Sequence, residues 1–222
     1  GRAKRMLFRQ IGPSSRKKVL ILPVVGTMVA GESAKPPGGI PLPVPFLGTE
    51  RVGDRTVVRQ VRSIMKRKNV AAVVLFVDSP GGVAIAAEAM TSALEQLSKD
   101  RPVVVYMNGV AASGGYYIAT AGRWIMAQPG TLTGSIGVVS AKPVAGSLLD
   151  RFQVHAHEFT RGANAGLYSE QHPFTDAQRA QVRASIEHIY RQFLGRVARS
   201  RSITQDKVDE VGGGRVWTGA QA

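Results

Sequence analysis

Two glycine-bearing turns contain the residue types that could do chemistry in this chain. The first is Asp78-Ser79-Pro80-Gly81-Gly82, and the second, residues 109–117, places Ser113 directly before two glycines. Paired glycines let the backbone approach a ligand closely and present N–H groups to it. Such amides at the start of a helix suit a developing oxyanion. Taken alone, the first segment could also be an ordinary tight turn, and Ser113 an ordinary helix N-cap.

A serine nucleophile needs a base, and no histidine stands in an evident partnership with Ser113 and an acid. His155 and His157 lie two residues apart on a predicted strand, so they share a face and could bind a metal. The pattern shows no third ligand, so a partly exposed polar face is the simpler interpretation, and we predict no metal site. A lysine could serve as the base instead, provided that burial lowers its pKa enough to make it neutral.

The composition indicates a folded domain without thiol chemistry. The chain has 222 residues, of which 44% are hydrophobic and 20% are charged, which suits one domain with a buried core rather than a disordered chain. The lack of cysteine excludes disulfides, thiolate metal sites and a cysteine nucleophile. The longest nearly unbroken apolar stretch, Val19 to Gly31, has 13 residues, too few to span a bilayer. The basic N-terminus lacks the apolar run of a signal peptide.

Positive charge is concentrated in two zones. The chain has 29 basic and 15 acidic residues, a formal net charge of +14. Residues 1–18 hold seven basic residues and no acid, and a predicted long helix holds six arginines between residues 179 and 201. This charge fits a solvated surface or contact with an anionic membrane. No helix-turn-helix, zinc-finger or aromatic RNA-binding motif accompanies it, so nucleic acid has only the charge in its favour and we expect no such partner.

Apolar strands and helical patterns alternate along the chain. The patterns predict strands over 19–30, 70–77, 102–107 and 124–127, and helices over 54–68, 83–97, 113–121, 174–200 and 203–211. A mobile, proline- and glycine-rich loop is predicted over 31–50, and the entrance to a further helix over 216–220. This alternation predicts an α/β fold with a parallel sheet and right-handed crossovers. Active loops should then lie at the carboxyl ends of the strands.

Three motifs in a fixed order resemble one protein family. The chain reads DSPGG at 78–82, GVAASGGYYIATAG at 109–122 and QPGTLTGSIGV at 128–138. Their order and spacing resemble the signal peptide peptidase A family, also called protease IV. The similarity continues through PFTDAQR at 173–179 and VWTGAQA at 216–222, so it covers nearly everything from Val19 onward.

The resemblance implies a fold, an activity and a site. The fold would be a crotonase/Clp-protease-like parallel β-α spiral with a long C-terminal helix. The activity would be that of a membrane-associated serine protease with a Ser–Lys dyad and no cofactor. By position, Ser113 matches the nucleophile. Gly82 and the amide of Gly114 match the oxyanion hole, and Ser135 matches the serine that orients the lysine.

The resemblance also implies a setting for the chain. Members of the family digest signal peptides and other apolar peptides left in the membrane after secretion. They assemble into bowl-like rings with the active sites facing inward. We therefore expect a domain outside the bilayer that is associated with the bacterial inner membrane. Its partners would be apolar peptides, the membrane surface and further copies in a ring.

One departure from the family pattern concerns the base. Short members carry the lysine in a Gly-x-x-Lys stretch after the nucleophile, but this chain reads Gly162-Ala163-Asn164-Ala165 there. Ala165 thus stands in the lysine's place and cannot accept the proton of Ser113. Long members have two tandem homologous halves, of which the first supplies the lysine and the second the serine. The chain resembles such a second half, with residues 1–18 as a basic linker and 19–222 as one peptidase domain cut short at its C-terminus.

The alanine at position 165 also leaves several alternatives open. Lys142 could swing to Ser113, although the family offers no precedent for that position. The chain could be a catalytically inactive assembly or scaffold subunit of a protease ring, or an engineered variant in which alanine replaces the lysine. A Clp-type protease would need a histidine soon after the nucleophile, and the next one is His155. A crotonase-type enzyme would bind an acyl-CoA with two backbone amides and no serine nucleophile.

Overall fold

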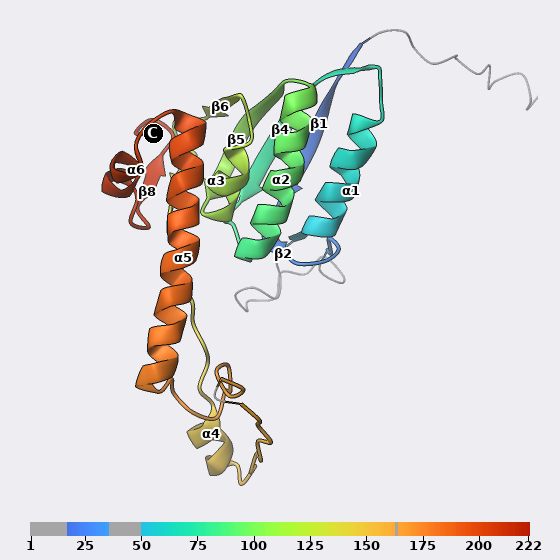
Figure 1. The fold of residues 1–222 in the computed structure, drawn as a ribbon. Coiled ribbons are helices and arrows are strands. Elements are labelled where there is room, and N and C mark those ends of the chain that lie inside the picture. Colours follow the sequence, from blue (N-terminus) through green and yellow to red (C-terminus); the bar gives the residue numbers. More distant parts are fainter. Residues whose placement is uncertain (1–16, 36–49, 163) are drawn as a thin grey trace, which may run out of the picture.

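The computed structural model describes residues 17–35, 50–162 and 164–222, and Figure 1 shows its elements. The strands are β1 (Lys18–Val25), β2 (Thr27–Val29), β3 (Arg51–Gly53), β4 (Val70–Ser79), β5 (Val103–Ala112), β6 (Trp124–Ala127), β7 (Leu132–Gly134) and β8 (Val216–Thr218). The helices are α1 (Asp54–Met65), α2 (Ala84–Asp100), α3 (Gly114–Ala119), α4 (Gly146–Arg151), α5 (Asp176–Arg201) and α6 (Gln205–Val211).

The main sheet is mostly parallel. Its strand order is β1-β4-β5-β7-β8, with β6 also paired to β5, and β8 runs antiparallel to β7. The short strands β2 and β3 form a second, parallel pair. Helices α1, α2 and α3 lie side by side against one face of the main sheet (Figure 1). The predicted α/β fold with a parallel sheet is confirmed, and the turns that follow β4 and β5 lie at the same edge of this sheet.

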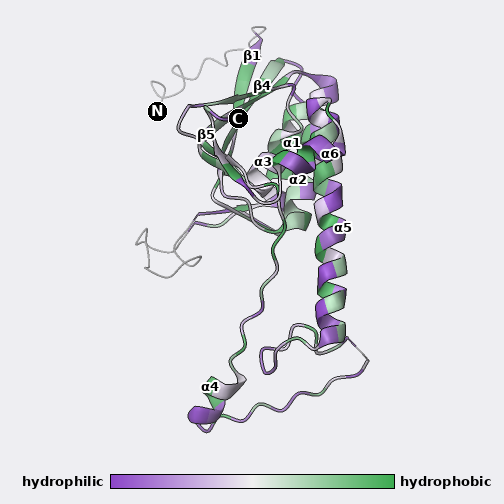
Figure 2. Cartoon of the chain, turned by 90° about the vertical axis from the view of Figure 1, so that its left-hand side faces the viewer, coloured by the Kyte–Doolittle hydropathy of each residue, from purple (hydrophilic) through white to green (hydrophobic). Residues whose placement is uncertain are grey.

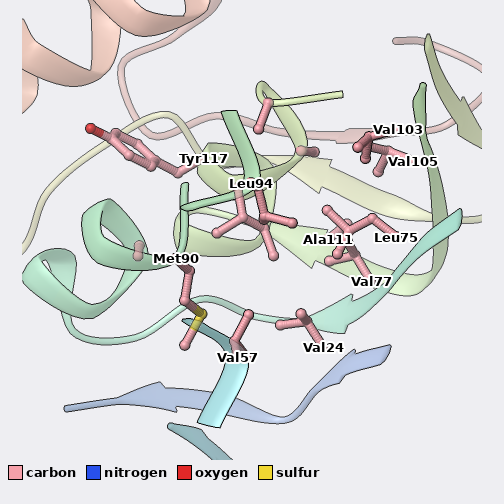
Figure 3. Packing of buried hydrophobic residues seen from close by; sticks show 14 of the residues in the cluster. Val24, Val57, Leu75, Val77, Met90, Leu94, Val103, Val105, Ala111 and Tyr117 are labelled. Atoms are coloured by element: carbon pink, nitrogen blue, oxygen red, sulfur yellow. The ribbon is translucent and has the colours of Figure 1, made fainter. Parts of the chain in front are cut away.

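The core lies between the sheet and the helices. Leu75 and Val77 of β4 and Val105 and Met107 of β5 are at most 1% exposed. They alternate with half-buried residues, because successive side chains of a strand point to opposite faces. Figure 3 shows members of this cluster beside Leu94 of α2. Each such buried side chain contributes about 1.5–3 kcal/mol, so the packing gives a rigid platform for the turns at the sheet edge.

Between β7 and α5 the chain leaves the body of the molecule. Figure 2 shows this segment running to α4 and back to the start of α5, whose N-terminal half also stands away from the sheet. We call residues 138–175 the arm. At its end, the Thr175 hydroxyl accepts from the Gln178 N–H in a capping box that starts α5. The long C-terminal helix is confirmed, and its residues 193–198 are buried against the body.

The structure corrects three predicted elements. The strand predicted over 19–30 is two strands in two sheets, because Gly26 adopts a φ of 91° between β1 and β2. Residues 216–218 form β8 instead of the start of a helix, since they pair with β7. His155 and His157 lie in irregular, exposed chain, so the strand predicted there is wrong.

The other predicted helices and strands are confirmed: β6 has the predicted ends, the rest have shifted ends, and β5 continues to Ala112. Of the predicted basic linker, residues 1–16 lie outside the described residues and Lys18 already belongs to β1. Most of the loop predicted over 31–50, residues 36–49, also lies outside them. Within the described ranges, no helix is long and apolar enough to cross a membrane. The same ranges contain no group of three or more His, Asp or Glu residues placed to hold a metal.

Candidate active site

A bulge in β5 lies directly before Ser113. Along the β4–β5 ladder, Val77 pairs with Met107 and Ser79 with Ala111, so β5 has two more residues than β4 over this stretch. A bulge bends its strand and redirects the residues beyond it. The bulge therefore helps to determine the position of Ser113 at the end of β5.

The Asp78 carboxylate and the Thr131 hydroxyl hold this bulge. Asp78 accepts hydrogen bonds from the Val110 N–H at 3.1 Å and from the Asn108 side-chain amide at 2.7 Å. The buried Thr131 hydroxyl donates to the Asn108 carbonyl at 2.6 Å. The sequence shows Asp78 only as the first residue of the DSPGG turn. Its role could have been inferred from two features of the sequence: an acid at the end of one strand and an Asn-Gly pair in the next strand.

We expect Asp78→Ala to destabilise the fold and Asp78→Asn to be nearly neutral. Alanine leaves two half-buried donors without an acceptor, at a cost of about 1–3 kcal/mol each. Asparagine keeps an oxygen for the Val110 N–H, and the Asn108 amide can flip so that its own oxygen accepts from the new amide. Urea denaturation of both variants measures the difference. Equal losses in the two would show that the charge of Asp78, rather than its hydrogen bonds, holds the bulge.

The DSPGG turn is anchored to the end of β1 through Ser79. This residue is fully buried. Its hydroxyl donates to the Gly26 carbonyl at 2.6 Å and accepts from the Gly81 N–H at 3.1 Å. One side chain thus fixes the turn from within, and the glycines that follow it are held in place.

Met28 of β2 pairs with the same turn and orients Gly82. The Met28 N–H donates to the Gly81 carbonyl at 2.8 Å, and the Met28 carbonyl accepts from the Val83 N–H at 3.0 Å. Met28 thus bonds to the Gly81 carbonyl and the Val83 N–H, the backbone groups on either side of Gly82. In this parallel pairing the Gly82 N–H points away from Met28. Among the described residues it donates to no acceptor, so it is available to a ligand.

Ser113 adopts a backbone conformation that favours glycine. Its φ is 51° and its ψ is −119°, a region in which other residues store strain. It occupies the N-cap position of α3, but its side chain makes no capping hydrogen bond. Ordinary N-caps have extended φ and ψ and accept a bond from the first turn. The interpretation of Ser113 as an ordinary N-cap is therefore wrong, and its half-buried hydroxyl is not used to stabilise the helix.

This strain predicts that Ser113→Gly is more stable than Ser113→Ala. Alanine retains the cost of the unusual φ, about 1–3 kcal/mol, whereas glycine removes it. The greater freedom of glycine in the unfolded chain offsets about 0.4–1 kcal/mol of this gain. Thermal and urea unfolding of the two variants should thus favour glycine by about 1 kcal/mol. An alanine variant of equal or higher stability would mean that Ser113 stores no strain.

The two glycine turns meet at Ser113. A methyl group placed on Gly81 would lie 2.5 Å from the Gly114 nitrogen and 3.0 Å from the Ser113 Cβ. One placed on Gly114 would lie 3.4 Å from the Gly82 nitrogen. The Gly114 N–H is the first of α3 and has no acceptor within the helix. The amides of Gly82 and Gly114 therefore flank the serine, an arrangement that suits an oxyanion hole.

Ser135 lies at the same edge of the sheet as Ser113. The Ser113 N–H donates to the carbonyl of Gly134 at 2.9 Å, and Ser135 follows with a φ of 49°. The Ser135 N–H donates to the Arg215 carbonyl at 2.6 Å, beside β8. Ser135 is half-buried. The structure thus brings the four predicted site residues of the two turns and the TGSIG motif to one edge.

None of the described lysines is placed to act as the base of Ser113. The Lys142 Nζ donates to the Leu167 carbonyl at 3.2 Å and lies 4.2 Å from the centre of the Phe174 ring, within the arm. Lys35 and Lys207 pair with Glu50 and Glu210. The remaining described lysines lie at the opposite edge of the sheet, where β1 and β4 begin and α1 and α2 end: residues 17, 18, 66, 68 and 99.

The histidines are also engaged away from Ser113. His155, His157 and His172 line a pocket of the arm together with Asp150. His188 contacts Gln192 on the exposed side of α5. None of these contacts involves the turns at the sheet edge, so no described histidine is placed to act as the base of Ser113.

Ala165, the position of the missing lysine, belongs to the arm. It is exposed, and its N–H donates to the Gly162 carbonyl at 3.2 Å. The residues that follow it are tied to the start of the arm, since the Ala145 N–H donates to the Glu170 carbonyl at 2.8 Å. These contacts keep position 165 within the arm and not beside Ser113 of the same chain.

Known families match the chain in two overlapping segments. The model of peptidase family S49 matches residues 95–222, more than half of the chain, which includes Ser113, Gly114 and Ser135. The chain belongs to peptidase family S49. The model of Clp protease matches residues 49–131, with both glycine turns. The Clp-protease-like fold of this S49 chain is therefore confirmed, as is its membership of a serine peptidase family.

Relatives of this S49 chain agree with the family match. It is 38% identical to the chloroplastic serine protease SPPA of Arabidopsis thaliana, over 75% of this chain and 25% of that protein. It is 34% identical to protease 4 of Haemophilus influenzae, over 92% of this chain and 31% of that protein. A putative signal peptide peptidase SppA of Enterococcus faecium is 29% identical over 94% of the chain. The chain thus spans a quarter to a third of the length of the first two relatives.

Proposed function

We propose that this S49 chain is a serine endopeptidase domain that degrades cleaved signal peptides and other apolar peptides through Ser113. The observation that carries the proposal is the uncapped Ser113 at positive φ, flanked by the free amides of Gly82 and Gly114. A hydroxyl in this place can attack a carbonyl, and the two amides can stabilise the oxyanion that results. The Enterococcus relative is a putative signal peptide peptidase, which supports this substrate class, and the Arabidopsis relative is a serine protease, which supports the reaction.

In the proposed reaction, the Ser113 oxygen attacks the peptide carbonyl carbon while a neutral lysine takes the hydroxyl proton. The oxyanion accepts hydrogen bonds from the N–H groups of Gly82 and Gly114. The C–N bond then breaks, and the lysine gives its proton to the leaving amine. Water hydrolyses the acyl-enzyme with the same lysine as base. An oxyanion donor contributes roughly 3–4 kcal/mol and the general base roughly 10²–10⁴-fold in rate.

The lysine of this dyad comes from outside the chain, and Ser135 orients it through a hydrogen bond. Ala165 at the family's lysine position and the contacts of Lys142 within the arm support this source. An arm that stands away from the body also favours an active site completed by another half or another copy (Figure 2). Ser135 suits the orienting role because it is half-buried at the edge that holds Ser113.

The proposed setting is a ring at the bacterial inner membrane. Residues 19–222 form the peptidase domain, which works beside a homologous N-terminal half that carries the lysine. The net charge of +14 favours an anionic membrane surface. No cofactor or metal takes part in the proposed reaction.

Covalent labelling of Ser113 tests the proposal. The full chain is treated with a fluorophosphonate, alone and after co-expression with a homologous S49 domain that carries the Gly-x-x-Lys stretch. Mass spectrometry then maps the label. We expect labelling of Ser113 to be about 10²-fold faster with the lysine-bearing domain present. No label in an assembled complex would favour the second candidate, an inactive assembly subunit, for which Ala165 is the supporting observation.

A further inference from the structure

One buried arginine connects the helices that begin at the two glycine turns. The Arg196 guanidinium donates to Glu88 at 2.8 Å and to Glu95 at 2.6 Å, both on α2. It also lies 5.0 Å from the centre of the Tyr117 ring on α3. The Tyr117 hydroxyl completes the cluster by donating to Glu88. We call these four residues the Arg196 latch.

Two members of the latch, Glu88 and Tyr117, lie one to two helical turns behind the proposed oxyanion hole, and Glu95 lies two turns further along α2. Helix α2 begins at Ala84, two residues after Gly82, and Glu88 is its fifth residue. Helix α3 begins at Gly114 itself, and Tyr117 is its fourth residue. The Tyr117 N–H donates directly to the Ser113 carbonyl at 2.8 Å. Any shift between the two helices at the latch is therefore transmitted to the two amides and the serine.

The latch is a fixed arrangement at neutral pH. Arg196 and Tyr117 are each 9% exposed. Burial, followed by the hydrogen bond to Glu88, raises the pKa of Tyr117 to about 12, so its hydroxyl stays protonated and remains a donor. Figure 3 shows the Tyr117 hydroxyl directed away from the apolar cluster. Phe193 of α5 packs edge-on against the Tyr117 ring, with the centres 4.9 Å apart.

Resting on the proposed function, we propose that Arg196 is a positioning residue that sets the spacing between the Gly82 and Gly114 amides. A buried ion pair adds little net stability, because desolvation offsets much of the attraction. The Arg196 Nε, buried and without a partner in the described chain, adds to that cost. The planar guanidinium supplies geometry instead, because it contacts two carboxylates of α2 while its central carbon lies over the Tyr117 ring. A lysine has no such planar group.

Kinetics of Arg196 variants in the assembly with the lysine-bearing domain test this role. We expect Arg196→Met to lower kcat about 10²-fold and to change KM by less than about twofold, since the groups that move, the two amides and Ser113, act on the transition state rather than on substrate binding. Affinity for a peptide boronic acid, which mimics the tetrahedral intermediate, should fall with kcat. Arg196→Lys should not restore either value. The matched control is Arg191→Met, an exposed arginine on the same helix, which should leave both unchanged.

A further variant separates positioning from folding. The triple variant R196M/E88Q/E95Q leaves no unpaired buried charge, so it should fold with a near-native Tm and still lose kcat and boronate affinity. Unchanged kcat in a folded Arg196→Met protein would overturn the proposal. Full activity of Arg196→Lys would also overturn it, because charge alone would then suffice.

NMR spectroscopy of the full chain tests the role of Arg196 even if the assembly shows no peptidase activity. The amide resonances of Gly82 and Gly114 should shift in Arg196→Met and not in Arg191→Met. An inactive wild-type assembly with this pattern would refute the proposed function and leave the latch standing. Unshifted resonances in Arg196→Met would refute the latch whatever the activity.

Discussion

Replacing Ser113 with alanine is expected to abolish peptide hydrolysis by the assembled protein and to lower kcat by roughly 10⁴–10⁶-fold. The only change is the loss of the attacking oxygen, because alanine keeps the backbone at φ 51° and the neighbouring amides in place. The measurement is hydrolysis of an apolar peptide by the variant and the wild type. Ser98→Ala, at a half-buried serine of α2, is the matched control and should retain full activity.

The amount of folded protein has to be equal for this comparison. Circular dichroism and the midpoint of urea unfolding show whether the Ser113 and Ser98 variants are folded to the same extent. Hydrolysis retained by a folded Ser113→Ala protein would refute Ser113 as the nucleophile. It would point instead to the crotonase type of chemistry, in which the amides act without a serine.

Gly81→Ala is expected to lower kcat at least about 10²-fold by forcing the two turns apart. The added methyl group would lie 2.5 Å from the Gly114 nitrogen, so the backbone has to move by much of an ångström. Displacements of that size in a positioned site cost about 10²-fold in rate. Gly81 also has a φ of 97°, so alanine adds backbone strain of about 1–3 kcal/mol.

Gly31→Ala provides the matched control for that strain. Gly31 has a φ of 103°, but a methyl group there would have nothing within 4 Å. In urea unfolding, both variants should show the loss of stability caused by the positive φ, and Gly81→Ala should lose more because its methyl group also meets the Gly114 nitrogen. Only Gly81→Ala should lose activity. Equal kcat values in the two variants would show that the contact between the turns has no role in the reaction.

The sequence motifs contain the candidate site residues because each turn has its reactive groups in consecutive residues. DSPGG and ASGG each combine small residues with the end of an apolar strand, and the structure brings Ser113, Gly82, Gly114 and Ser135 to one edge. The backbone of Ser113 could not be predicted in the same way. Its positive φ occurs directly after the bulge in β5 and beside the hydrogen bond to Gly134, and both features involve strands far away in the sequence.

The burial of Arg196 was beyond a pattern-based prediction for the same reason. In the sequence it is one of six arginines in a basic helix, and the others of this group are exposed. Its partners Glu88 and Glu95 lie more than 100 residues earlier in the chain. Only the packing of α5 across α2 and α3 gives this one arginine two carboxylates and an aromatic face.

The errors in predicted elements have local causes. The apolar run of residues 19–30 has the composition of one strand, but Gly26 turns the chain into a second sheet. Residues 216–218 become a strand because β7 offers a free edge for pairing. Polar and aromatic residues between α4 and α5 follow neither helical nor strand periodicity, and the histidines there lie in irregular chain.

A crystal structure of the assembled protein with a peptide boronic acid tests the proposed active site most directly. We expect a bond from boron to the Ser113 oxygen and a boronate oxygen within about 3 Å of both the Gly82 and Gly114 nitrogens. A lysine from outside this chain should lie within hydrogen-bonding distance of the Ser113 oxygen. A boronate bound elsewhere, or a lysine of this same chain at Ser113, would contradict the proposed site.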